Sequence, residues 1–130
     1  MDLESAFALA VTPVGRRASW SALQFVDAWE FFVESVTTGF GGDIYEFEHV
    51  LSVSDAVEQA LSDERLCGIP EWARSIERID AADARLRAVL ARGPRIRSNA
   101  PWWRERLPES AGEEMVADAL RLFQVSLEVA

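Results

Sequence analysis

The most regular apolar pattern in the chain is PEWARSIERIDAADARLRAVLAR, residues 70–92. Its apolar side chains recur at alternating four- and three-residue steps, which is typical of one face of a helix. They are Trp72, Ile76, Ile79, Leu86 and Leu90. Pro70 suits the first turn of a helix, and Gly93-Pro94 is a stop signal. The segment therefore predicts a long helix against which the rest of the chain packs.

Asp83 interrupts this apolar stripe between Ile79 and Leu86. A buried carboxylate is costly unless it accepts good hydrogen bonds or meets an arginine. We interpret Asp83 as a structural residue bound to a backbone amide, an indole N–H or a guanidinium. Catalysis is the less favoured interpretation, because structural pairs also perturb carboxylates.

Three further helices are predicted. Residues 19–38 form one, with Ser19 as N-cap and Gly39 just beyond its end. Its expected inward residues are Trp20, Leu23, Trp29, Phe32, Val33 and Val36. A second, about ten residues long, starts at Ser52 as N-cap, with Asp55 at N3 and Val53, Val57 and Leu61 inward. Residues 43–51 fit either a helical face or a strand, and a short helix is the preferred interpretation.

The segment Ser110-Ala111-Gly112-Glu113 matches a capping box and predicts one more helix. Its expected inward residues are Met115, Val116, Ala119, Leu120 and Phe123. Residues 7–11 and 123–129 alternate between apolar and polar, so they could form a ribbon, or the second could continue the helix. The sequence thus predicts a mainly α, single-domain bundle of about four to five helices over residues 1–130, with a small two-stranded ribbon from the termini left open.

The net charge of −9 sits in the first half of the chain. Residues 1–63 contain eleven acids and two arginines, whereas residues 64–130 contain eleven of each. All thirteen basic residues are arginines, a composition typical of a bacterial protein from a GC-rich genome. A lopsided anion favours a cationic partner and argues against nucleic acid or an anionic membrane. Acids at Asp2 and Glu4 argue against a signal peptide, and a lone cysteine suits a reducing compartment, so a cytoplasmic location is expected.

Catalytic and cofactor signatures are weak. His49 is the single histidine, and Cys67 has no CxxC partner, so neither a nucleophilic triad nor a zinc site is indicated. Glu46 and His49 form one Glu-x-x-His step, which a dimer could double into a metal site with Glu30 or Glu34. We therefore expect a protein that is not an enzyme and needs no cofactor or metal.

Residues 94–109 form a loop marked by prolines, and its Trp102-Trp103 pair is followed by Arg104 and Arg106. Aromatic and basic side chains together can bind single-stranded nucleic acid, but the acidic charge opposes it. We expect instead that the tryptophans cover the end of the helix cluster and that the arginines pair with its carboxylates.

The favoured function is a non-enzymatic binder that neutralises a basic protein, as small acidic immunity and antitoxin proteins of bacteria do. Carboxylates would steer the partner and aromatic residues would anchor it. The expected partner-binding residues are Trp29, Glu30, Glu34, Phe40, Asp43, Tyr45, Glu46, Glu48, Asp55 and Glu58. The alternatives are a homo-oligomer, in which the arginine-rich half meets the acidic half of another copy, and a small metal-binding enzyme.

Overall fold

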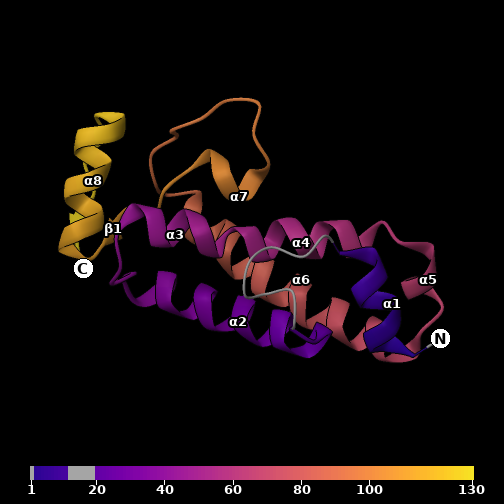
Figure 1. Cartoon of the computed structure of the whole chain (residues 1–130). Coiled ribbons are helices and arrows are strands. Elements are labelled where there is room, and N and C mark those ends of the chain that lie inside the picture. The colour runs from indigo at the N-terminus through magenta and orange to yellow at the C-terminus, as the bar shows by residue number, and fades with distance from the viewer. Residues whose placement is uncertain (1, 12–19) are drawn as a thin grey trace.

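The helix predicted from residues 70–92 is the longest element of the computed structural model, which describes residues 2–11 and 20–130. It is α6 (Pro70–Leu90), and Pro70 occupies its first turn. Four residues of the expected stripe are buried and Ile76 is half-buried. The buried four are Trp72, Ile79, Leu86 and Leu90. The spacing argument is therefore confirmed for this helix (Figure 1).

Helix α2 (Ala22–Thr38) runs alongside α6 and makes the most extensive helix contact of the described fold. Its N-cap is Ser21, whose hydroxyl accepts from the backbone of Gln24 while the Gln24 side chain accepts from the backbone of Ser21. The predicted cap, Ser19, lies outside the described residues. Gly39 ends the helix with φ of 109°, a conformation that favours glycine.

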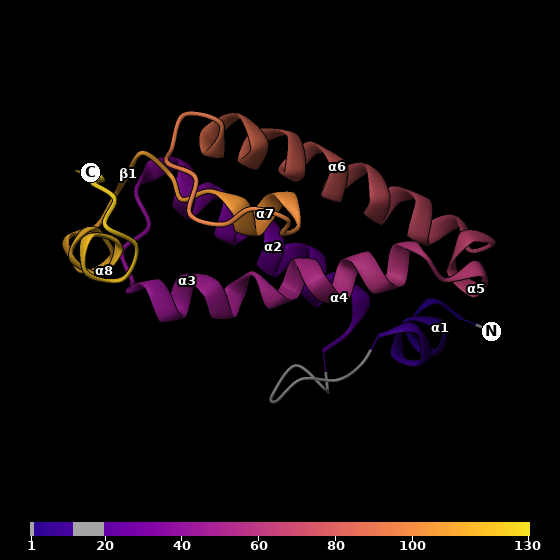
Figure 2. The same ribbon diagram turned by 90° about the horizontal axis from the view of Figure 1, so that it is seen from above.

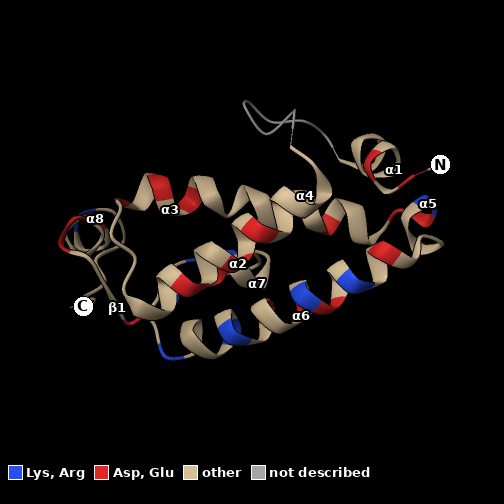
Figure 3. Ribbon diagram, turned by 90° about the horizontal axis from the view of Figure 1, so that it is seen from below, with Lys and Arg blue, Asp and Glu red and all other residues tan. Residues whose placement is uncertain are grey.

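Helices α3 (Ile44–Val50) and α4 (Ser52–Leu61) follow one another on the other side of α2 (Figure 3). The short helix predicted at residues 43–51 is confirmed, with Asp43 as its N-cap. The predicted cap of α4 is wrong, because Ser52 lies in the first turn and its hydroxyl donates back to the His49 carbonyl. Helix α5 (Glu64–Cys67) then turns the chain toward α6.

The N-terminal strand alternative is wrong, since residues 3–10 form helix α1 (Leu3–Ala10). Its inner face holds Ala6 and Phe7, with the partly buried Leu3 and Ala10 at helical spacing beside them. Leu9, which completed the apparent alternation, points to solvent. The ring of Phe7 packs against Phe25 and Trp72, so α1 closes one end of the bundle.

The loop at residues 94–109 contains the short helix α7 (Trp102–Glu105) and lies over the bundle (Figure 2). Trp103 is buried and Trp102 is half-buried beneath the Arg87 guanidinium, 4.2 Å from the ring centroid. The two tryptophans cover the helix cluster as expected, but they lie over its side between α4 and α6 and not over its end.

The C-terminal part consists of β1 (Ser110–Ala111), α8 (Glu113–Phe123) and β2 (Glu128–Val129). The two strands pair in parallel, Ser110 with Glu128 and Ala111 with Val129. The predicted capping box is wrong, because Ser110 belongs to a strand and Gly112 precedes the helix.

The inward faces of two helices were predicted with one error each: Leu23 of α2 and Leu120 of α8 are exposed. Otherwise the predicted mainly helical bundle is confirmed, with a two-stranded sheet that joins residues 110–111 to the C-terminus. Within residues 2–11 and 20–130, every helix is too short or too polar to cross a bilayer.

Candidate functional site

The inner contact between α2 and α6 accounts for Asp83. The indole Nε1 of Trp29 donates to Asp83 Oδ1 at 2.7 Å, and Trp29 is only 1% exposed. An indole N–H is among the partners expected for this carboxylate. Partial burial raises the pKa of Asp83, and the bond from Trp29 opposes that rise. Trp29 therefore cannot anchor a partner from this position, which corrects its assignment as a binding residue.

The outer edge of the same helix pair is a row of ion pairs. Arg78 donates to Asp27 at 2.7 Å and to both oxygens of Glu30, and Arg85 lies 3.7 Å from Glu34. Arg78 and Arg85 are seven residues apart, two turns of one helix face. Glu30 and Glu34 thus have partners within the chain, and Figure 3 shows red and blue bands of α2 and α6 side by side.

The covering loop engages two more of the predicted binding residues. Asp55 accepts from the Trp103 indole at 2.9 Å and from Arg104 at 2.6 Å. Glu48 is paired with Arg97, at 2.5 Å. The expectation that the loop arginines pair with bundle carboxylates is confirmed for Arg104. It is wrong for Arg106, which donates to the backbone carbonyl of Gly93 at 2.8 Å.

A different arrangement exists where α3 meets α8. Asp43, Glu46 and Glu114 each place a carboxylate oxygen within 4.8 Å of the others. Among the described residues, no arginine lies within salt-bridge distance of these three carboxylates. We call Asp43, Glu46 and Glu114 the acidic junction. Each sits in the first turn or cap of a helix, where the helix dipole offsets part of the repulsion.

Asp118 fixes the geometry of the acidic junction. Its Oδ2 accepts from the backbone N–H of Ile44 at 3.2 Å, and its Oδ1 accepts from Arg121 at 2.9 Å. The bond from Arg121, and next the one from Ile44, lower the pKa of Asp118. The nearest α8 arginine is thus held by Asp118 and the neighbouring Tyr45.

Tyr45 is 59% exposed beside the acidic junction. Phe40 is half-buried, with its ring centroid 5.4 Å from Phe47 and 5.8 Å from Phe32. Glu58 is exposed on α4. The structure therefore brings together Asp43, Tyr45 and Glu46 from the predicted set, leaves Phe40 nearby, and places the paired acids elsewhere.

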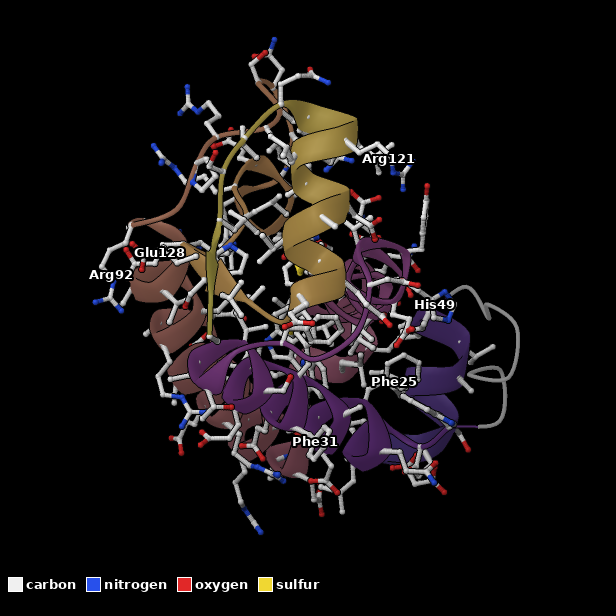
Figure 4. All side chains as sticks on the ribbon, turned by 90° about the vertical axis from the view of Figure 1, so that its left-hand side faces the viewer. Phe25, Phe31, His49, Arg92, Arg121 and Glu128 are labelled. Atoms are coloured by element: carbon white, nitrogen blue, oxygen red, sulfur yellow. The ribbon has the colours of Figure 1, made fainter. Side chains whose placement is uncertain are left out.

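The residues suggested for other chemistry are dispersed. Cys67 is exposed at the end of α5, where its thiol contacts the Asp63 carbonyl at 3.5 Å. His49 is exposed on α3 (Figure 4). Glu30 and Glu34, which the metal-binding alternative needs beside Glu46 and His49, are held by α6 arginines. Among the described residues, the potential metal ligands that do lie close together are the three carboxylates of the acidic junction, which include neither His49 nor Cys67.

Comparisons with protein-family models, with curated proteins and with solved structures each find no match. The site is therefore interpreted from its own geometry.

Sequence reasoning missed Glu114, Asp118 and Phe31. Glu114 and Asp118 reach the site because α8 packs on α3, a long-range contact that local periodicity does not encode. For Phe31 the sequence did offer an indication, because this residue lies outside the inward spacing of α2. In the structure its side chain is 78% exposed. A single exposed aromatic residue is ordinary on a protein surface, and it points to a contact beyond the chain's own core only as part of a larger apolar patch.

Proposed function

We propose that this protein is a non-enzymatic, immunity- or antitoxin-like module that binds and neutralises a basic protein in the cytoplasm. The proposed contact surface is the acidic junction together with the exposed ring of Tyr45. This narrows the sequence-based surface, because Glu30, Glu34, Glu48 and Asp55 are engaged by arginines of the same chain.

One observation supports the proposal above the others: three carboxylates converge without an arginine among the described residues. Like charges about 4 Å apart repel by ~1 kcal/mol per pair even in water, and by more near a protein surface. A guanidinium or ammonium group inserted by a partner would turn this repulsion into attraction. A cation is therefore attracted more strongly to the acidic junction than to a carboxylate that an arginine already neutralises.

Tyr45 adds the second element of such a surface. Tyrosine is enriched among the residues that dominate binding energy, because its ring buries apolar area while its hydroxyl stays polar. The carboxylates would raise the association rate, and the ring would slow dissociation.

Self-association remains the alternative proposal. It requires arginines of one copy to reach acids of another, but Arg78, Arg85, Arg97 and Arg104 already pair within the chain. Light scattering at low and high salt separates the two proposals: a salt-sensitive dimer supports self-association, and a monomer at both supports a foreign partner.

The proposed function is tested by affinity capture from the source cells, followed by association kinetics with the purified captured protein. We expect a basic protein whose association slows steeply as salt rises. The double variant Glu46→Gln/Glu114→Gln should slow association about tenfold or more at low salt. Adding a chelator should change nothing, which separates protein binding from cation binding at the junction.

The matched control is Glu64→Gln/Glu77→Gln. It removes the same charge from exposed residues of α5 and α6, and α5 lies at the end of the bundle opposite α8 (Figure 1). Equal slowing in both double variants, or capture of no basic protein, would contradict the proposal.

A further inference from the structure

An apolar groove of about 470 Å³ runs between α2 and the α3–α4 pair. Its apolar lining includes Trp20, Phe31, Phe32, Phe40, Val50 and Val53. Phe31 forms one edge of the groove, and its side chain is the most exposed large apolar side chain of the described residues (Figure 4). Among the described residues, the lining comes from α2, from Trp20 and Phe40 on either side of it, and from the α3–α4 pair, and it includes no residue of α6. The packing between α2 and α6 therefore does not fill the groove.

The polar groups in this groove do not point to a small-molecule ligand. The remaining lining residues are Ala28, Ser35 and Asp27. The Ser35 hydroxyl donates to the Phe32 carbonyl of its own helix at 2.7 Å, and Asp27 accepts from Arg78. Small-molecule sites usually have a few convergent polar groups that orient the ligand. The lining of this groove is instead a broad apolar surface, which suits the apolar side chains of a protein segment.

The charge around the groove is negative at both ends. Asp27, 59% exposed, shares the single guanidinium of Arg78 with Glu30, so two carboxylates and one arginine leave one negative charge. At the other end, the Glu46 carboxylate and the edge of the Phe40 ring lie together over Gly42. A methyl group on Gly42 would be 2.6 Å from Glu46 Oε2 and 3.1 Å from Phe40 Cε1. Arginine is absent from the described lining.

Glu46 also belongs to the acidic junction, so the junction adjoins the end of the groove that Phe40 lines. An occupant that fits both must present apolar side chains to the groove and cations to its two ends. An amphipathic helix with basic flanks has this pattern, with apolar anchors three and four residues apart.

We infer that the groove between α2 and α3–α4 binds the apolar face of a basic amphipathic helix of the partner protein. This inference rests on the proposed function and specifies the partner's binding element. Phe31 packs against that helix, while Asp27 and Glu46 contact its basic residues.

The test uses a labelled synthetic peptide of about five helical turns, with leucines at helical spacing on one face and lysines on the other. A second peptide carries glutamates in place of the lysines. Fluorescence anisotropy should show saturable binding of the basic peptide and none of the acidic one. Phe31→Ala should weaken the affinity for the basic peptide about tenfold.

Leu23→Ala is the matched control, because Leu23 is an exposed apolar residue of the same helix outside the groove. It should bind within about twofold of the wild type. Equal binding by the Phe31 and Leu23 variants, or equal binding of the acidic peptide, would overturn the inference. So would a wild-type dimer that Phe31→Ala makes monomeric, because the occupant would then be a second copy.

The same variants separate this inference from the proposed function. Suppose that Phe31→Ala captures the basic partner as well as the wild type does, while Glu46→Gln/Glu114→Gln does not. The inference about the groove is then wrong, and the proposed function stands. If the wild type captures no basic protein, the proposed function itself is wrong.

Discussion

The α2–α6 interface and the acidic junction are both rich in carboxylates, but arginines neutralise the carboxylates only at the interface. At the interface, Asp27, Glu30 and Glu34 face two arginines spaced two turns apart on α6. At the junction, carboxylates from α3 and α8 meet with no arginine among the described residues. The net charge of the acidic half therefore says little about where its potential is strong, because that depends on which acids the arginines reach.

The two regions also differ in what their charges contribute to folding. The interface pairs are half-exposed, and such pairs contribute little, about 0–1 kcal/mol each. The contacts beneath them, centred on Trp29 and Asp83, are buried or partly buried. We conclude that the outer row neutralises the face and that the inner contact stabilises it.

The largest effect is expected from Asp83→Leu. It leaves the buried indole N–H of Trp29 without its acceptor, so the free energy of unfolding should fall by about 1–3 kcal/mol. Asp83→Asn keeps an oxygen acceptor and should be close to the wild type. Denaturant unfolding of the three proteins checks this, and an equal loss in both variants would show that the charge matters rather than the hydrogen bond.

The pH dependence of Asp83 follows from its raised pKa. The folded state holds the proton more tightly than the unfolded chain, so this residue's contribution to stability falls as pH rises from about 3.9 through the raised pKa. Above that window the contribution is flat. Asp83→Asn should remove this descending step from the stability profile, and a profile that keeps the step would contradict the assignment.

A second effect is expected from Asp55→Ala. It removes the acceptor of both the buried Trp103 indole and Arg104, and should cost about 1 kcal/mol. Glu58→Ala on the same helix is the control, since Glu58 is exposed and should change stability by less than about 0.5 kcal/mol. Thermal unfolding compares them, and equal losses would mean that Asp55 does not hold the loop.

Arg78→Met is expected to have a smaller effect, a loss of less than about 1 kcal/mol that shrinks further at high salt. The variant leaves Asp27 and Glu30 unpaired but preserves the apolar stem of residue 78. A salt series of denaturant curves tests it. A loss above about 2 kcal/mol would show that the outer row is a principal stabilising contact, contrary to the comparison drawn above.

The smallest effect on stability belongs to Glu46→Gln/Glu114→Gln. The substitutions relieve repulsion but lose favourable interactions with two helix dipoles, so unfolding should change by less than about 0.5 kcal/mol in either direction. Calorimetry at neutral pH checks this. A large destabilisation would mean that the junction is a structural element of the fold.

The sequence predicted those parts of the molecule that local chemistry determines. The spacing of Trp72, Ile79, Leu86 and Leu90 gave α6, and Pro70 marked its start. Caps were less certain, because a serine near a helix start can take another role that tertiary contacts decide: Ser110 belongs to a strand, and Ser52 lies inside the first turn of α4. Residues 3–10 could be misassigned because Phe7 and Val11 fit both a strand alternation and a helical face.

The candidate site could be predicted only in part. Asp43, Tyr45 and Glu46 are neighbours in sequence, so a local pattern placed them together. The pairing of Glu30, Glu34, Glu48 and Asp55 depends on residues about fifty positions away. Glu114 approaches Asp43 and Glu46 across about seventy positions. Trp29 fitted both the buried stripe and the list of aromatic anchors. In the structure it is buried, and its indole donates to Asp83.

The most direct measurement compares two double variants that change net charge equally, Glu46→Gln/Glu114→Gln and Glu34→Gln/Glu48→Gln. Stopped-flow association with the captured basic protein is recorded over a range of salt concentrations. We predict that the first variant slows association about tenfold at low salt and flattens its salt dependence, while the second remains near the wild type. Equal slowing in both, or a larger effect from the second, would contradict the account.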